Sequence, residues 1–173
     1  APFTEWNDKF RDTTRAFWRG DKSKVSAVAA RLAGSAEYFD HDGRAATSSL
    51  NFITAHDGFT LQDTVSYSEK HNQANKEGNR DGHSDNYSDN LGVEGPTDDP
   101  DILAKRTRRK RNMKATLLLS QGTPMMLAGD ELSNSQGGNN NAYCQDNEIG
   151  WVTWPDAEDP FFTFCQQAIA FRR

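Results

Sequence analysis

The sequence predicts an α/β fold with a parallel sheet, and two patterns indicate it. Two short apolar runs, residues 50–55 and 123–128, each end in polar residues, as buried parallel strands do. Helical patterns precede, connect and follow these runs, and this alternation indicates βαβ units. Two strands are too few for a complete α/β domain, because a parallel sheet needs cover on both faces and neighbours at its edges. We therefore expect residues 1–173 to form one part of a larger barrel or sheet.

The segment 7–39 predicts helices. In the first helix, Phe10, Thr14, Phe17 and Trp18 recur at three- and four-residue steps, the spacing of one helix face. Asn7 or Asp8 can cap its start, and Gly20 breaks it. A shorter apolar stripe at Val25, Val28, Ala29 and Leu32 predicts a second helix that stops at Gly34.

His56 and Asp57 directly follow the first predicted strand. In parallel α/β architectures, ligand-binding and catalytic groups gather at the carboxyl ends of the strands. A carboxylate there can stabilise developing positive charge, and an imidazole can form a hydrogen bond with a polar substrate. The alternative is that Asp57 only caps the turn through Gly58. Placement alone leaves both interpretations open.

The middle of the chain combines a polar loop with a basic helix. Residues 69–101 carry few apolar side chains, and a loop of this length is typically functional or a mobile surface insertion. Residues 101–121 predict a helix, and six of the seven residues 105–111 are basic. Six charges over seven positions point in every direction around a helix. We therefore expect solvated basic side chains on a surface helix, not a nucleic-acid patch.

Polar residues also follow the second predicted strand. Adjacent residues at a strand end point apart, so Asp130 and Glu131 are expected to form a turn and hydrogen bonds, not an acid/base pair. The amides of residues 139–141 together with Tyr143 suit carbohydrate binding, and they equally suit a well hydrogen-bonded loop. Residues 161–171 predict a last helix.

Composition and motifs argue against a nucleic-acid-binding protein, a membrane-spanning protein and a metal site. The net charge of −5 disfavours a dedicated nucleic-acid binder, and no apolar run reaches the ~18–20 residues of a membrane span. Neither cysteine, Cys144 or Cys165, lies in a zinc-ligand pattern. The histidines of the loops lack the spacing of metal ligands; they are His41, His71 and His83. No signal peptide is visible, which favours reduced thiols in a cytoplasm. We expect no metal, no cofactor, no membrane or nucleic-acid partner, and a cytoplasmic location.

Motifs over nearly the whole chain point to a family. The stretch NFITAHDGFTL at 51–61 is joined by EWNDKFRD at 5–12 and by a loop that runs from KHNQAN at 70–75 to NYS at 86–88. LLLSQGTPM at 117–125 follows, and then AGDE at 128–131 continues to GNNNAYCQDN at 138–147. Together these motifs resemble the debranching branch of the α-amylase superfamily of glycoside hydrolases, the isoamylases and bacterial glycogen debranching enzymes. Ala55 stands where many amylases have Asn, as it does in debranching members.

The resemblance implies a (β/α)8 TIM barrel. Residues 50–55 and 123–128 would be its seventh and eighth strands, and residues 1–173 the C-terminal part of the catalytic domain, truncated at both ends. The family hydrolyses α-glucosidic bonds with retention, and this branch cuts α-1,6 branch points of glycogen-like α-glucans. It uses a nucleophile and a general acid about 5 Å apart. In the family these two carboxyl groups follow the fourth and fifth strands, which this sequence does not include.

Two site residues carry over from the resemblance. Asp57 matches the third carboxylate, which stabilises the transition state, and His56 matches a hydrogen-bond donor to the hydroxyls of the distorted sugar. The resemblance implies an α-glucan substrate, the remainder of the catalytic barrel as a partner, and an isolated chain without activity. The alternative is a fragment that binds glucan without hydrolysing it or that has a purely structural role.

Overall fold

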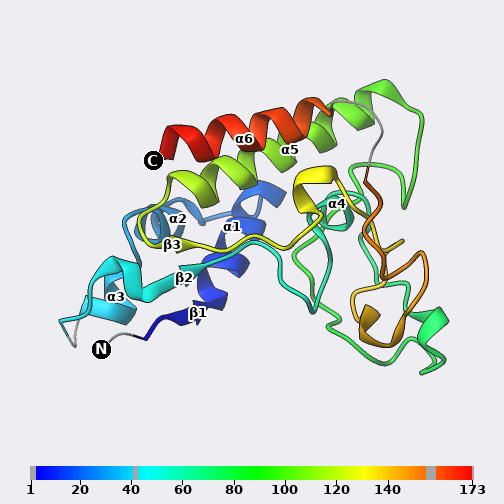
Figure 1. The fold of residues 1–173 in the computed structure, drawn as a ribbon, viewed down its shortest axis with the longest axis horizontal. Helices are drawn as coiled ribbons and strands as arrows, with labels where there is room; N and C mark the ends of the chain where they lie inside the picture. The colour runs from blue at the N-terminus through cyan, green and yellow to red at the C-terminus, as the bar shows by residue number, and fades with distance from the viewer. Residues whose placement is uncertain (1–2, 41–42, 155–158, 173) are drawn as a thin grey trace.

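A short parallel sheet lies at the centre of the molecule. The computed structural model describes residues 3–40, 43–154 and 159–172 (Figure 1). Within these ranges the sheet has three strands, β1 (Glu5–Asn7), β2 (Ser49–Asn51) and β3 (Thr123–Pro124), in the order β1-β2-β3. All neighbours are parallel, with Glu5 opposite Ser49 and Leu50 opposite Thr123. The predicted α/β class with a parallel sheet is therefore confirmed.

The strands differ from the sequence prediction in number and length. β1 occupies a segment that we had not predicted as a strand, because its three residues show no strand pattern and its pairing with β2 is long-range. β2 ends at Asn51, where the prediction continues to residue 55. Beyond it, the carbonyl of Ile53 accepts from Arg15 Nε at 2.8 Å and does not pair with a strand. β3 ends at Pro124, opposite Asn51, the last residue of its partner β2, and the N–H of Met125 still donates to Asn51 O at 2.7 Å.

The first N-terminal helix begins and ends at the predicted residues, and the second ends at Leu32, just before the predicted stop at Gly34. α1 (Asp8–Arg19) is capped by the Asn7 side chain, which accepts from the N–H of Phe10 at 2.9 Å. Gly20 ends it in the left-handed conformation with φ +103°, and its N–H reaches the last carbonyls of the helix. α2 (Val25–Leu32) and the single turn α3 (Ala36–Phe39) follow.

α5 (Pro100–Leu119) confirms the predicted long helix and corrects the prediction for its basic residues. Asp99 caps its start, accepting from two backbone N–H groups. Arg106, Lys110 and Lys114 are buried, so the expectation of solvated basic side chains is wrong for this face. Four-residue steps place the three side chains on one side of the helix. Oxygen atoms of the segments packed there accept their hydrogen bonds, for example Gly95 O from Arg106 at 2.7 Å.

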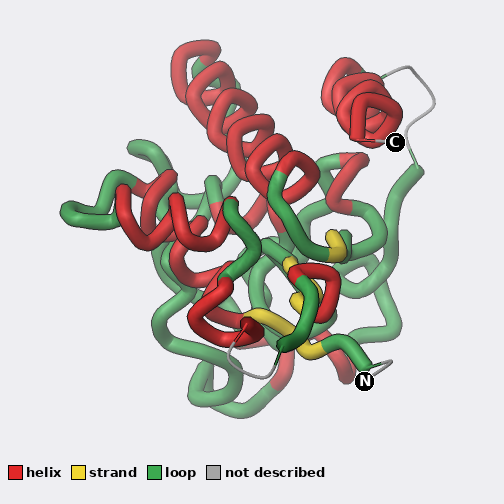
Figure 2. The backbone as a smooth tube through the Cα atoms, turned by 90° about the vertical axis from the view of Figure 1, so that its left-hand side faces the viewer, coloured by secondary structure: helices red, strands yellow, loops and turns green. Residues whose placement is uncertain are grey.

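The apolar core joins both ends of the chain. α6 (Pro160–Arg172) runs along α5 (Figure 1), and its Phe161 and Cys165 are buried. α4 (Leu61–Thr64) closes the core from the loop side. Figure 2 shows the short strands surrounded by helices and long loops. The core side chains are Phe10, Ile53, Leu61, Val65, Met113, Leu117, Phe161 and Cys165. Among the described residues, no helix combines the length and apolar character that crossing a membrane requires.

Candidate functional site

One buried carboxylate holds the turn that follows β2. Asp130 accepts hydrogen bonds from the Thr54 hydroxyl and from the N–H of Leu61, the latter at 2.9 Å, so it holds this turn at both ends. Lys114 Nζ lies 2.9 Å from the same carboxylate, and both side chains are fully buried. The expected structural role of Asp130 is thereby confirmed. The turn that carries His56 and Asp57 rests on this ion pair.

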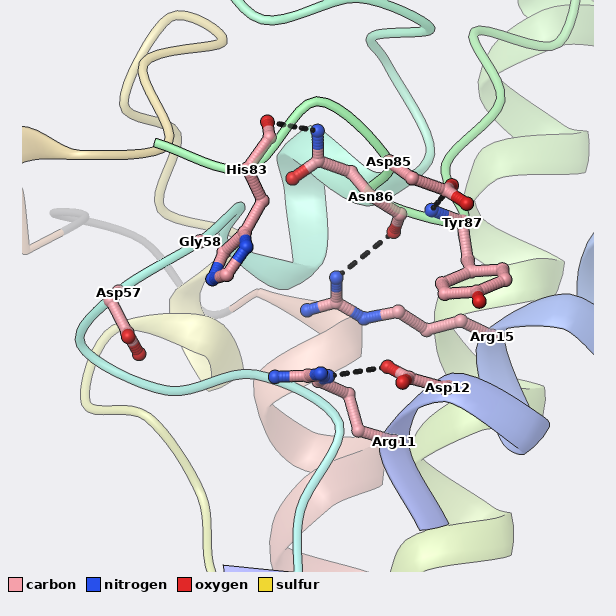
Figure 3. Close-up of a pocket in the computed structure, with 9 residues that line it drawn as sticks. All are labelled: Arg11, Asp12, Arg15, Asp57, Gly58, His83, Asp85, Asn86 and Tyr87. Atoms are coloured by element: carbon pink, nitrogen blue, oxygen red, sulfur yellow. Dashed lines mark hydrogen bonds and ion pairs between the residues drawn. The ribbon is translucent and has the colours of Figure 1, made fainter. Parts of the chain in front are cut away.

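Asp57 lines a polar pocket of about 230 Å³ (Figure 3). Gly58 follows it with φ +100°, which other residues rarely adopt, and donates its N–H to Asn140 O at 2.9 Å. The pocket thus has a fixed backbone immediately after Asp57. Its lining residues come from α1, from the turn after β2 and from the loop 69–101, and they are Arg11, Asp12, Arg15, Asp57, Gly58, His83, Asp85, Asn86 and Tyr87.

His56 lines a different hollow. Its ring meets that of Trp6 edge-on at 5.9 Å, next to residues 125–128. Both His56 and Asp57 are exposed, but they lie on a bend of the chain and line different hollows. The structure therefore does not bring the two predicted site residues into one pocket, and it places Asp57 with the arginines of α1.

The two arginines differ in their surroundings. Arg15 is 5% exposed and donates to Ile53 O at 2.8 Å and to Asn86 O at 3.0 Å. Burial lowers the pKa of Arg15 to about 10. Arg11 donates from Nε to Asp12 at 2.7 Å, and its guanidinium lies 5.6 Å from the centre of the Phe52 ring. Arg15 therefore ties the pocket wall together, while Arg11 forms part of a half-buried ion pair at the pocket.

Three comparisons place the chain among known proteins. No protein-family model matches it. The "Glycogen operon protein GlgX homolog" of Mycobacterium tuberculosis (strain ATCC 25618 / H37Rv) is 54% identical over 173 residues, which are 99% of this chain and 24% of that protein. The "Glycogen debranching enzyme" of Serratia proteamaculans (strain 568) is 53% identical over 99% of this chain and 26% of that protein. The chain is homologous to the glycogen debranching enzymes. It spans about a quarter of the length of these relatives.

Solved structures agree on the fold of this debranching-enzyme homologue. Pullulanase type I from Bacillus subtilis str. 168, complexed with maltose, matches 98% of this chain and 22% of its own, with a TM-score of 0.67 and 22% identity. The apo pullulanase of Paenibacillus barengoltzii gives the same TM-score over 24% of its chain. At this identity the likeness shows the fold alone, and the neighbours are pullulanases of the amylase family. The resemblance seen in the sequence is confirmed.

Sequence reasoning did not identify the other residues of the Asp57 pocket. The sequence contains a pattern that could have identified Arg11 and Arg15, because their four-residue spacing puts them on one face of α1. The wall formed by residues 83–87 had no such pattern, since its polar residues follow no period. Among the described residues, no group of three or more His, Cys, Asp or Glu side chains could hold a metal ion. His41 lies outside the described residues.

The structure favours the interpretation of residues 139–141 as a hydrogen-bonded loop over that as a carbohydrate contact. Asn139 and Asn140 are both 1% exposed, and their side chains bond to the loop 69–101. Tyr143 is 85% exposed. Buried amides cannot contact a glucan directly, so Asn139 and Asn140 form a hydrogen-bonded loop that supports the pocket wall. The same bonds tie the loop 69–101 to the rest of the chain.

Proposed function

We propose that residues 1–173 form the C-terminal part of the (β/α)8 catalytic domain of a hydrolase that removes α-1,6 branches from glycogen-like α-glucans. Residues 50–55 and 123–128 correspond to its seventh and eighth strands. One observation carries the proposal. Asp57 lies on the turn that follows β2 and lines a polar pocket, within a segment 53% identical to a glycogen debranching enzyme. The carboxyl end of parallel strands is where TIM-barrel enzymes place catalytic groups.

Asp57 acts in this proposal as an electrostatic stabiliser. The transition state of glycoside hydrolysis carries positive charge on the sugar ring, and a fixed carboxylate favours it. The nucleophile and the general acid of the retaining mechanism come from other strands of the barrel, so the isolated chain is inactive. His56 donates a hydrogen bond to a sugar hydroxyl. Because His56 and Asp57 line separate hollows, they contact different positions of the glucan.

The polar lining of the pocket supports an α-glucan as substrate. Guanidinium, carboxylate, amide and imidazole groups surround it, and each can bond to hydroxyls. Three of the related pullulanase structures contain α-glucans, one with maltose, one with maltotetraose and one with maltohexaose and α-cyclodextrin.

The test replaces Asp57 by Asn in the full-length hydrolase that contains this segment. The substitution keeps size and removes charge, so we expect kcat for release of linear glucans from glycogen to fall roughly 10²- to 10³-fold. Binding of maltohexaose should persist. The matched control is Asp98→Asn, which neutralises an exposed carboxylate that does not line the pocket. Activity of the Asp57 variant within a few-fold of wild type would refute the catalytic role.

Two further outcomes distinguish the alternatives. A full-length protein that binds maltohexaose but releases no glucan would establish glucan binding without hydrolysis. Release of linear glucans by the purified 173-residue chain would overturn the assignment of the nucleophile and the acid to other strands.

A further inference from the structure

The pocket that holds Asp57 has a wall formed by residues 83–87. In this wall the imidazole of His83 points into the pocket, between Asp57 on one side and the guanidinium of Arg15 on the other (Figure 3). His83 is exposed, and none of the described residues forms a hydrogen bond with its ring. The ring is thus available to a molecule that enters the pocket.

The backbone of this wall is fixed. The carbonyl of His83 accepts from Asn140 Nδ2 at 2.7 Å and from Asn86 Nδ2 at 3.2 Å. The carbonyl of Asn86 accepts from the buried guanidinium of Arg15 at 3.0 Å. Residues 83 and 86 are therefore attached to α1 and to the loop that follows β3, and the direction of the His83 side chain is set by the fold.

Asn140 connects this wall to Asp57. Its carbonyl accepts from the N–H of Gly58, the residue after Asp57, at 2.9 Å, while its side chain donates to His83 O and to Asn86. The remaining groups of Asn140 pair with Asn72, whose Nδ2 donates to Asn140 Oδ1 at 2.8 Å. With all its polar groups used and 1% exposure, Asn140 fixes the separation between Asp57 and the wall.

The other side chains of the wall are engaged within the protein. Asp85 accepts from the N–H of Tyr87, Asn86 bonds to Asn140, and Arg19 lies 5.3 Å from the centre of the Tyr87 ring. His83 is the wall residue whose side chain has no such partner among the described residues. A neutral imidazole offers one donor and one acceptor, which matches sugar hydroxyls that both donate and accept.

We propose that His83 is a substrate-contacting residue that binds a sugar hydroxyl in the Asp57 pocket, and that Asn140 is the positioning residue that holds it there. This inference rests on the proposed function, because it takes the pocket to be the site of an α-glucan. It assigns the loop 69–101 a role in recognition: the loop supplies one wall of the sugar site.

The first experiment measures the affinity of maltohexaose by calorimetry, in the full-length protein with Asp57→Asn to prevent turnover. His83→Ala should weaken binding about threefold to tenfold, the net effect of one hydrogen bond to a neutral partner. His83→Gln, which keeps a donor and an acceptor, should restore part of it. His71→Ala is the control, since this histidine of the same loop pairs with Glu94 and does not line the pocket. Unchanged affinity of the His83→Ala variant would overturn the inference.

The second experiment separates positioning from general stability. Asn140→Asp keeps the size but turns a carboxylate oxygen toward His83 O, so we expect the wall to shift and affinity to fall as for His83→Ala. Added to His83→Ala, the Asn140→Asp change should weaken maltohexaose binding by less than a further twofold, because both changes remove the same contact between His83 and the sugar. Fully additive losses would show that Asn140 acts only through stability. If the parent protein neither binds nor hydrolyses α-glucans, the proposed function fails. If the parent protein is active but His83→Ala leaves the affinity for maltohexaose unchanged, only this inference is refuted.

Discussion

The ion pair between Asp130 and Lys114 makes a sharp prediction about the turn that carries Asp57. Both side chains are fully buried, and the carboxylate also holds Thr54 and the N–H of Leu61. Asp130→Asn keeps the shape and leaves the ammonium of Lys114 without its counter-charge. Removing one partner of a buried pair destabilises by about 3–5 kcal/mol. At 1.4 kcal/mol per factor of ten, opening of this region should become roughly 100- to 4,000-fold more frequent.

Native-state hydrogen exchange followed by mass spectrometry can measure this opening locally. The amides of Gly58 and Leu61 should lose protection in Asp130→Asn, because Leu61 donates directly to the carboxylate. Asp98→Asn, at an exposed site, should leave their exchange unchanged. Under the proposed function, kcat of the full-length hydrolase should fall together with the protection, since the turn fixes Asp57.

The double variant is the decisive measurement. Lys114→Met alone should also destabilise, because Asp130 would keep its charge in a buried site. Replacing both partners removes both charges, so Asp130→Asn with Lys114→Met should be more stable than either single variant. Protection within twofold of wild type in Asp130→Asn would refute the reasoning. A double variant less stable than both singles would also refute it.

Two buried groups predict opposite pH dependences of the free energy of unfolding. Burial raises the pKa of Asp63 to about 6, above its unfolded value of about 3.9, so its stabilising contribution is complete below pH 4 and is lost as the pH rises through 6. Urea denaturation should show wild type losing stability relative to Asp63→Asn between pH 4 and about pH 6; a constant difference would contradict this. Burial lowers the pKa of Lys110 to about 8, from about 10.4 in the unfolded chain, so wild type should gain stability relative to Lys110→Met between about pH 8 and about pH 10. Parallel curves for these two proteins would show that Lys110 titrates normally.

Local signals in the sequence determined the helices. Asn7 caps α1 through the N–H three residues on, and Gly20 ends it with a positive φ. Pro100 opens α5, and Gly122 follows its end. These features act within one or two helical turns, so neighbouring residues contain all the information. The position of Asp57 after a strand was predictable for the same reason, because the apolar run and the polar residues that end it are contiguous.

The tertiary structure decided what depends on partners distant in the sequence. β1 is a strand because β2, more than forty residues later, pairs with it. The buried face of α5 depends on oxygen atoms of Gly95 and Gln62, distant in the sequence, that accept from Arg106 and Lys110. The wall that faces Asp57 depends on Asn140, which is 57 residues from His83. Single hydrogen bonds between loops follow no sequence period, and buried polar groups must find partners wherever the fold places them. The sequence alone therefore placed Asp57 at a strand end, whereas only the folded chain determined which side chains share its pocket.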